Sequence, residues 1–378
     1  MGTGLLNCHC QCHYYANKEM TFNIPIKDNR INIEKENNKL NQNLFETIDR
    51  KNIFFDNKKF SNLISEKILF YMKNNRLNYK SFQFSILDLS KYNPIELLNN
   101  NVYIGDIKDD NKMEGYGIYI INDKKVIVEG IWKKGCLIYG RIFFSNDDIY
   151  EGEISQSLPN GTGKFFFGNG DIYKGDFILG EITGKGIYIF EDKTYYCGCL
   201  INGVFNGEGS MNWINGDEYH GIFSDSTLNI KGKIFNDLLC EKYIGLFENN
   251  EFHGKGIYSY QNGDIYEGNF EYGIRSGKGK YKMKNGIEFF GLWDKDSPNG
   301  EGVISSSKFK IKGIWKNGVK VEILEILEGN NSNIDLKNVD LNIKTSKRKI
   351  IPSSLPHLNI NDKTVISQYV LTSDVNKE

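Results

Sequence analysis

A nine-residue phrase occurs three times in the chain, as NGDIYKGDF at residues 169–177, NGDEYHGIF at residues 215–223 and NGDIYEGNF at residues 262–270. At its centre a large apolar residue stands two positions before a glycine. The glycines in this setting are Gly105, Gly130, Gly152, Gly175, Gly198, Gly221, Gly245, Gly268, Gly291 and Gly313. Neighbouring members lie 22 to 25 residues apart, most often 23. A period this regular indicates an array of about ten structural repeats over residues 101–320.

The repeat has the composition of a β-hairpin. Large apolar side chains stand two residues before and two residues after the central glycine, and this period of two predicts β-strands. A G-x-G motif such as Gly207/Gly209 follows, and Asn-Gly pairs such as Asn215-Gly216 close several repeats. Asn and Gly tolerate positive φ angles, so we predict a two-residue type I′ turn at each Asn-Gly pair and a looser turn at the opposite edge.

The predicted fold is all-β, an elongated, single-layer antiparallel meander of stacked β-hairpins. One hairpin is too small to be stable, so neighbouring hairpins must supply the packing. We expect the strand glycines to make room for the aromatic ring of the neighbouring repeat. The resulting ring ladders have two interpretations, either the core of the sheet or, where exposed, a binding face. The ring residues concerned are Tyr150, Tyr173, Phe177, Tyr196, Tyr219, Phe223, Tyr243, Phe247, Tyr266, Phe270 and Trp293.

The repeat resembles the MORN repeat, whose pattern reads roughly Y-x-G-x-F-x-x-G-x-x-x-G-x-G-x-Y-x-x-x-N-G-D, over about 220 of the 378 residues. The resemblance implies a non-enzymatic scaffold that binds protein partners, often at membranes or cytoskeletal boundaries. It implies, as an alternative, a module whose repeats bind phospholipid headgroups directly. Some members form homodimers through their C-terminal repeats. The Asn-, Lys- and Ile-rich composition is typical of AT-rich protist genomes, in which such proteins often lie at cortical membranes.

Three repeats depart from the pattern. The second has Ile138 where the first glycine of G-x-G belongs, and the sixth has Ile230 at the same place. The tenth ends after Trp315 and Gly318, which suits the end of an array. We expect the second and sixth repeats to bend or locally disorder the sheet.

The N-terminal sequence MGTGLLNCHCQCHYY has the features of an acylated segment. Gly2 after the initiator methionine meets the first requirement for myristoylation, although Leu6 replaces the usual Ser or Thr. One myristoyl chain binds membranes only weakly, so a second signal is needed. Palmitoyl groups on Cys8, Cys10 and Cys12 would supply it. This interpretation predicts a peripheral protein on the cytoplasmic face of a membrane, either the plasma membrane or a cortical inner membrane.

The same cysteines have two other interpretations. Cys8, Cys10 and Cys12 could ligate zinc together with His13, although this spacing is compressed for a zinc finger. They could also be incidental residues of a disordered tail. The odd total of seven cysteines is not a disulfide framework and favours a reducing compartment.

The flanks of the array form separate segments. Residues 1–16 are the anchor segment, residues 17–100 are rich in Asn and Lys, and residues 321–378 are mostly a disordered tail. An amphipathic helix is predicted near residues 61–74, with Ser61 as its N-cap. Its apolar face would contain Leu63, Ile64, Ile68, Tyr71 and Met72. This face either docks a partner or membrane, or packs on the first repeats as a cap.

The sequence gives no sign of catalysis. Each G-x-G leads into a strand, whereas a phosphate cradle needs a glycine-rich loop that opens a helix. His220, His253 and His357 have no partner at ligand or triad spacing, and no run of eighteen apolar residues occurs. The net charge of −1 offers no field for nucleic acid. We therefore predict a protein that is not an enzyme, that uses no cofactor and that binds no nucleic acid.

Overall fold

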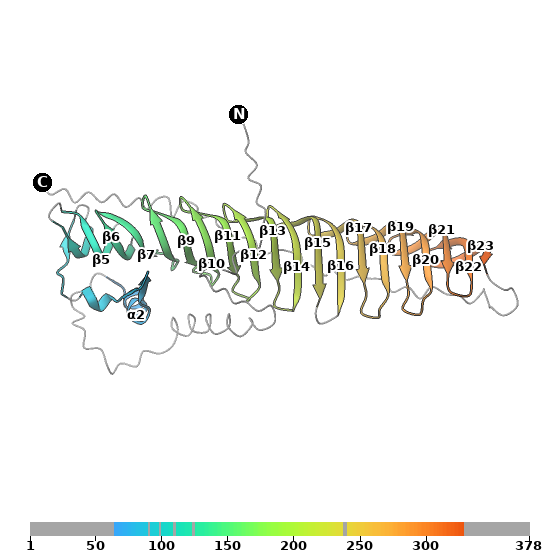
Figure 1. Ribbon diagram of the computed structural model, residues 1–378, viewed down its shortest axis with the longest axis horizontal. Helices are drawn as coiled ribbons and strands as arrows, with labels where there is room; N and C mark the ends of the chain where they lie inside the picture. Colours follow the sequence, from blue (N-terminus) through green and yellow to red (C-terminus); the bar gives the residue numbers. More distant parts are fainter. Residues whose placement is uncertain are drawn as a thin grey trace, which may run out of the picture. The chain divides into compact units, whose positions relative to one another are not determined.

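The computed structural model describes residues 64–328, apart from residues 90, 98–99, 109–110, 123–124 and 237–239. The described chain is nearly all-β (Figure 1). It divides into two compact units, the first ending at Ile182 and the second beginning at Thr183. In each unit the strands of the repeat array form a single-layer antiparallel meander, because each of them pairs with the next one in the unit.

The first unit begins with a small non-repeat segment. It contains helix α2 (Glu66–Asn74), the hairpin of β1 (Leu77–Tyr79) and β2 (Phe82–Phe84), and the 3-10 helix η3 (Ile86–Leu89). The Oγ of Ser65 accepts a hydrogen bond from the Ile68 amide, so the N-cap lies four residues after the predicted Ser61. Ser61 and Leu63 lie outside the described residues.

The sheet of the first unit runs through eight strands. They are β3 (Ile95–Glu96), β4 (Val102–Ile107), β5 (Met113–Ile121), β6 (Val126–Lys133), β7 (Cys136–Phe143), β8 (Ile149–Ser155), β9 (Leu158–Phe166) and β10 (Ile172–Ile178).

The second unit contains the longer run of strands. They are β11 (Glu181–Ile189), β12 (Tyr195–Ile201), β13 (Val204–Asn212), β14 (Asp217–Ser224), β15 (Thr227–Asn236), β16 (Glu241–Glu248), β17 (Glu251–Ser259), β18 (Ile265–Glu271), β19 (Ile274–Lys282), β20 (Glu288–Asp294), β21 (Ser297–Ser305), β22 (Lys310–Lys316) and β23 (Val319–Glu328).

The turn types at the two hairpin edges are the reverse of the predicted ones. At Asn215-Gly216 only the glycine has a positive φ, +87°, and its amide donates to the carbonyl of Trp213. This is a tight turn that ends in one left-handed residue. On the opposite edge two consecutive residues have positive φ, as Asn202 (49°) and Gly203 (74°) do, and a type I′ turn requires this. The prediction was wrong because Asn-Gly also suits the longer loop, where glycine alone takes the left-handed position.

In most repeats the aromatic ring above the strand glycines belongs to the same repeat, so the expectation of a ring from the neighbouring repeat was wrong. Gly221 lies opposite Gly232, and the ring of Tyr219 covers both. The Tyr219 hydroxyl donates to the carbonyl of Ile222 at 3.2 Å. The same bond to the carbonyl three residues on is made by Tyr103, Tyr150, Tyr173, Tyr196, Tyr243 and Tyr266. Glycine is needed here because the ring occupies the space of a side chain.

The two degenerate repeats keep their strand pairing in the described residues, so the local disorder that we expected does not occur in these strands. Strand β7 pairs with β6 and β8, and β15 pairs with β14 and β16. In the sixth repeat Ile230 takes φ of 66°, close to the 74° of Gly207 and the 58° of Gly254. A β-branched residue in this conformation is strained.

Replacing Ile230 by glycine is therefore expected to stabilise the second unit. Relief of the left-handed strain gains about 1–2 kcal/mol, and the greater entropy of glycine in the unfolded chain removes about 0.5–1 kcal/mol of it. The net gain is read from the urea midpoint of the full chain. Ile244→Gly is the matched control, because Ile244 is also exposed but lies in regular strand β16. If Ile230→Gly lowers the urea midpoint as much as Ile244→Gly does, the backbone at Ile230 is not strained.

Candidate interaction surface

The face of the sheet that carries the repeat rings is closed. All eleven ring residues from Tyr150 to Trp293 are at most 5% exposed. In the second unit the rings follow one another edge to face, with centroids 5.0–5.2 Å apart from the Tyr196–Phe223 pair to the Tyr266–Trp293 pair. This geometry is favourable for aromatic pairs. The rings thus form the core.

The opposite face, which we call the outer face, carries the residues on either side of the central glycine and of the second glycine of G-x-G. In the second unit it exposes apolar side chains from 36% at Ile244 to 55% at Phe290. Cross-strand neighbours there include Ile244 opposite Ile257 and Lys280 opposite Phe290. We define the lysine–apolar strip as Lys231, Lys233, Ile244, Leu246, Lys255, Ile257, Lys278, Lys280, Phe290 and Leu292.

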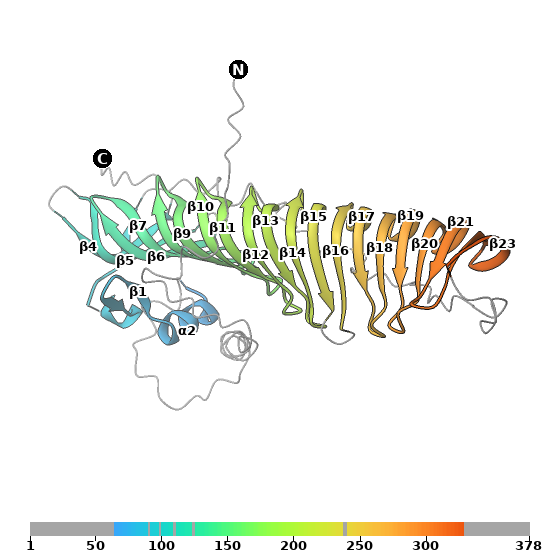
Figure 2. The same ribbon diagram turned by 45° about the vertical axis from the view of Figure 1, so that its right-hand side comes forward.

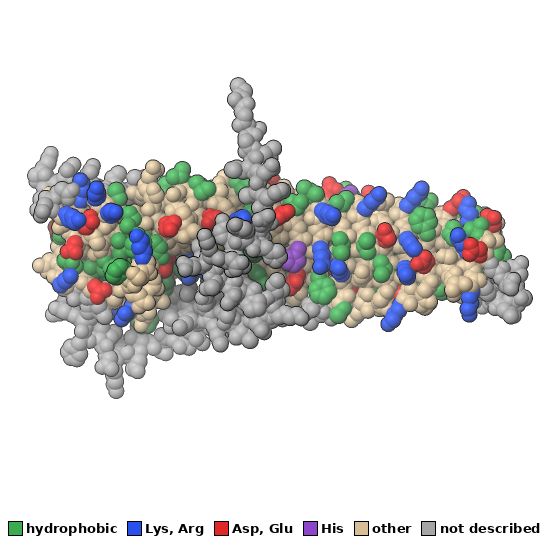
Figure 3. Space-filling view, viewed as in Figure 1, with side chains coloured by type: hydrophobic (Ala, Val, Ile, Leu, Met, Phe, Trp, Pro, Cys, Tyr) green, Lys and Arg blue, Asp and Glu red, His purple; other side chains and the backbone are tan. Residues whose placement is uncertain are grey.

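The strip is more basic than acidic. Lys280 pairs with Glu288 at 2.8 Å, but Lys231, Lys233, Lys255 and Lys278 form no ion pair with any described residue. Lysine and hydrophobic side chains lie side by side along the second unit (Figure 3). The strip therefore offers apolar area and free positive charge to a partner.

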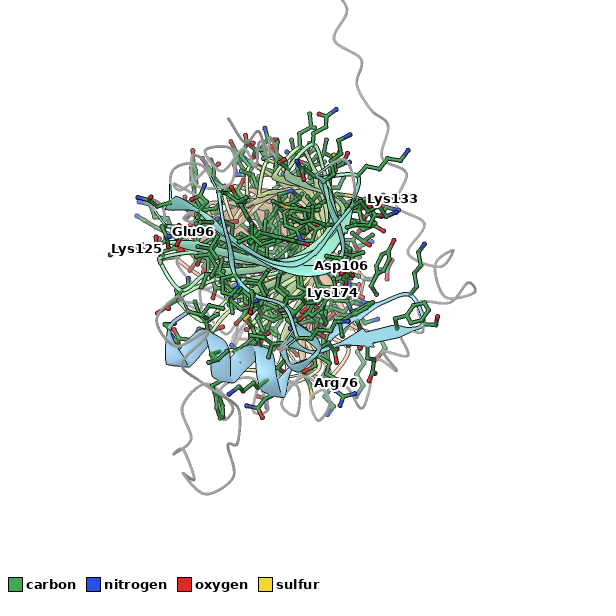
Figure 4. All side chains as sticks on the ribbon, turned by 90° about the vertical axis from the view of Figure 1, so that its left-hand side faces the viewer. Arg76, Glu96, Asp106, Lys125, Lys133 and Lys174 are labelled. Carbon is green, nitrogen blue, oxygen red and sulfur yellow. The ribbon has the colours of Figure 1, made fainter. Side chains whose placement is uncertain are left out.

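The outer face of strands β4 to β7 is covered by the N-terminal segment of the same unit. Tyr71 of α2 contacts Phe143 with ring centroids 5.8 Å apart, and Phe84 of β2 stacks on Tyr116 at 5.2 Å. Figures 2 and 4 show α2 lying along one side of the first strands, with Arg76 in the segment that follows it. Ile64, Leu69, Met72, Leu77, Ile86 and Leu89 share one apolar cluster with the outer-face residues Ile104, Ile118 and Ile131.

A buried ion network fixes this covering segment. Arg141 is 2% exposed and Glu129 is fully buried, and they pair at 3.3 Å. Arg141 also pairs with Glu151 at 2.7 Å and donates to the backbone carbonyls of Asn75 and Arg76 at 2.5 and 2.7 Å. Tyr116 donates to Glu129 at 2.5 Å. Burial raises the pKa of Glu129 to about 7, although the nearby Arg141 acts to lower it.

The described residues contain no cluster of metal ligands. No group of three His, Cys, Asp or Glu side chains in this part of the chain could hold a metal ion, and none of its helices is long and apolar enough to span a bilayer. The repeated aspartates serve the turns: Asp264, for example, accepts from the hydroxyl of Tyr281 and the amide of Lys284, both at 2.8 Å. His220 is exposed, and His253 pairs with Glu248 at 3.2 Å.

The predicted N-terminal sites cannot be placed. Gly2, Cys8, Cys10, Cys12 and His13 lie outside the described residues, as does His357.

Comparison with protein families identifies the repeat. The MORN repeat model matches six segments, residues 107–125, 150–172, 173–195, 196–218, 243–265 and 266–287. The chain is a MORN-repeat protein. The unmatched stretches contain the second and sixth repeats, with Ile138 and Ile230, and the end of the array. The sixth nevertheless has the geometry of a MORN hairpin, since Tyr219 covers Gly221 and Gly232.

Solved structures add little to this identification. The TCP10 domain of Danio rerio CPAP, in complex with a peptide of STIL, is 8% identical over 60% of this chain and 99% of that chain, with a TM-score of 0.23. The TCP10c domain of Drosophila melanogaster Sas-4 is 16% identical over 44% of this chain and 92% of that chain, with a TM-score of 0.22. Likeness at this level carries no argument about function. A search of curated proteins gave no match.

The last MORN strand has a distinct surface of its own. In β23 the side chains of Val319, Val321, Ile323, Leu324, Ile326 and Leu327 are between 40% and 62% exposed. Among the described strands β23 pairs only with β22. Its outer edge therefore carries apolar side chains and backbone groups that pair with no other described strand.

Proposed function

We propose that this protein is a non-enzymatic, membrane-associated scaffold whose MORN repeats recruit protein partners or cytoskeleton. The observation that carries the proposal is the contrast between the two faces of the second unit. Its ring face is closed by the Tyr–Phe ladder, whereas its outer face exposes Ile244, Leu246, Phe290 and free lysines. Function in a repeat protein resides on such an extended surface.

The proposal places the anchor at the N-terminus. A myristoyl group on Gly2 and palmitoyl groups on Cys8, Cys10 and Cys12 would hold the chain on the cytoplasmic face of a plasma or cortical membrane. We expect Gly2→Ala to move the protein from the membrane pellet to the soluble fraction, because palmitoylation depends on prior membrane contact. Cell fractionation with immunoblotting measures the change.

Leu6→Ser is the matched control for this prediction. It restores the hydroxyl residue that myristoylation usually requires, so it should keep or raise the membrane fraction. Mass spectrometry of the N-terminal peptide separates the interpretations of the cysteines: acyl groups support the anchor, and bound zinc on unmodified thiols replaces it. Unchanged partitioning of Gly2→Ala would remove the acyl anchor from the proposal.

The alternative function is direct binding of phospholipid headgroups by the repeats. Lys231, Lys233, Lys255 and Lys278 favour it, since they are free of ion pairs with described residues. Flotation of the unacylated full chain with phosphoinositide vesicles tests it. Flotation that disappears in Lys231→Glu/Lys233→Glu would establish the alternative, and no flotation would remove it.

The proposal also includes a homodimer through the C-terminal repeats. The exposed apolar side chains of β23 support it, because a second copy pairing along this edge would cover them. Sedimentation velocity of the full chain measures the state, and a monomer at tens of micromolar concentration would contradict the dimer.

A further inference from the structure

We infer that the lysine–apolar strip of the second unit binds an amphipathic helix of a partner protein whose flanks are acidic. This inference rests on the proposed scaffold function and names the chemistry of the partner.

Equivalent outer-face positions in the two units differ in exposure. Ile104 precedes a central glycine and lies opposite Ile118, which follows a G-x-G; Ile244 and Ile257 form the same pair in the second unit. Ile104 and Ile118 are 0% exposed, whereas Ile244 is 36% and Ile257 is 41% exposed. The N-terminal segment with α2 accounts for the difference, because it packs with Ile104 and Ile118 in one apolar cluster. The outer face of this repeat is thus a surface on which an amphipathic helical segment docks.

The second unit repeats this surface, and no described segment outside the sheet covers it there. Phe290 lies opposite Val303 at the same repeat positions as Ile244 and Ile257. Leu246 and Leu292 follow the central glycines of the same two repeats and are 40% and 41% exposed. Two apolar patches therefore lie on β16–β17 and β20–β21. Strands are spaced about 4.8 Å apart, so these patches lie about 19 Å apart. At 1.5 Å per residue, a helix with apolar residues about 13 positions apart reaches both.

Charge selects the flanks of that helix. Lys231, Lys233 and Lys255 surround the first patch, and Lys278 and Lys280 adjoin the second. Glutamates on the sides of the helix would pair with them, while its apolar face covers the isoleucines and Phe290.

The position of Glu267 favours a helix over a membrane. Glu267 lies between the two patches, opposite Ile257 on one side and Lys280 on the other. An anionic bilayer that covered both patches would repel the carboxylate between them. One basic residue on a helix can instead pair with it.

Fluorescence anisotropy with designed peptides tests the inference on the unacylated full chain. The probe is a labelled 18-residue helix with a leucine stripe, glutamate flanks and one central lysine. A peptide with lysine flanks and a scrambled peptide serve as ligand controls. We expect the acidic helix to bind at least tenfold more tightly than either control.

Two strip variants and one control variant locate the site. Phe290→Ser/Leu292→Ser removes apolar contact and Lys231→Glu/Lys233→Glu reverses charge, so each should weaken binding about tenfold or more, since tenfold corresponds to about 1.4 kcal/mol. Ile201→Ser/Tyr272→Ser removes exposed apolar residues at the hairpin turns and should change binding less than twofold. Circular dichroism checks that each variant keeps its β-signal.

Three results would overturn the inference: equal binding of the lysine-flanked helix, wild-type affinity in both strip variants, or binding of anionic vesicles without binding of the acidic helix. The anchor experiment on Gly2 is independent of all three. Loss of the anchor would leave helix binding standing, and absence of helix binding would leave the anchor standing.

Discussion

Gly221→Ala is expected to lower the free energy of unfolding of the second unit by about 3 kcal/mol, the upper range for overpacking a core. A Cβ at this position would lie 2.2 Å from the hydroxyl oxygen of Tyr219 and 2.7 Å from the Cα of Gly232. The ring cannot retreat freely, because its hydroxyl is bound to the Ile222 carbonyl and its edge meets Phe223 and Phe247. The opposite strand would have to move away.

The control for this variant is Gly273→Ala. Gly273 has φ of +77° in a type I′ turn and no atom within 4 Å of an added Cβ, so alanine there meets only backbone strain of about 1–2 kcal/mol. Urea unfolding of the full chain, followed by far-ultraviolet circular dichroism, compares the two. Equal losses would show that the tyrosine does not occupy the space above the strand glycine.

Arg141→Met is expected to release the covering segment of the first unit. It leaves Glu129 fully buried without its cation, and removal of one partner from a buried pair costs about 3–5 kcal/mol. It also removes the hydrogen bonds to the carbonyls of Asn75 and Arg76. Hydrogen exchange of the α2 amides measures the release, and wild-type protection would contradict it.

The effect of Arg141→Met should depend on pH. The pKa of Glu129 in the folded chain is about 7, above its ordinary value of 4.5, so the folded state binds more protons between these values. Stability contributed by this group therefore rises as pH falls from about 7 toward 4.5. Arg141 acts to lower the pKa of Glu129, so its removal raises this pKa further and extends the pH dependence to higher pH. The covering segment of the variant should therefore be less stable at pH 8 than at pH 6.

A second substitution provides the control for the pH dependence. Glu129→Gln in the Arg141→Met background removes the titrating group and keeps an acceptor for the Tyr116 hydroxyl. Protection of α2 should then recover at pH 8 and lose its dependence on pH over this window. A pH profile that persists in the double variant would assign the titration elsewhere.

The sequence predicts the strands well because each repeat constrains them several times. Alternating apolar residues around Gly221 fix which side chains face the core, and the pairing of Gly221 with Gly232 leaves a single register for the ring of Tyr219. The turn types were less predictable, because Asn-Gly fits both a type I′ turn and a longer loop with one left-handed glycine. Ile230 shows the opposite case, in which the neighbouring strands impose a conformation that its own side chain disfavours.

The outer face was not predicted, because the aromatic residues define the repeat and the residues between them vary in type from one repeat to the next. The signal is present as the triplets Lys-Gly-Lys at residues 231–233 and 278–280, Ile-Gly-Leu at 244–246 and Phe-Gly-Leu at 290–292. The strip consists of residues that stand directly before or after a central glycine or the second glycine of a G-x-G motif, and these positions share one face of the sheet. The charged cluster of Glu129, Arg141 and Glu151 adjoins the glycines in the same way, but its bonds to the backbone carbonyls of residues 75 and 76 could not be found from the sequence.

Hydroxyl-radical footprinting of the full chain tests most directly whether the repeat rings are core and the outer face is the surface available for binding. We expect strong labelling of Phe290, at 55% exposure, and of Tyr272, at 64%. Tyr219, Tyr243 and Tyr266 are 0% exposed and should remain unlabelled until the chain unfolds. Rapid labelling of these three tyrosines with protection of Phe290 would contradict the assignment of the two faces.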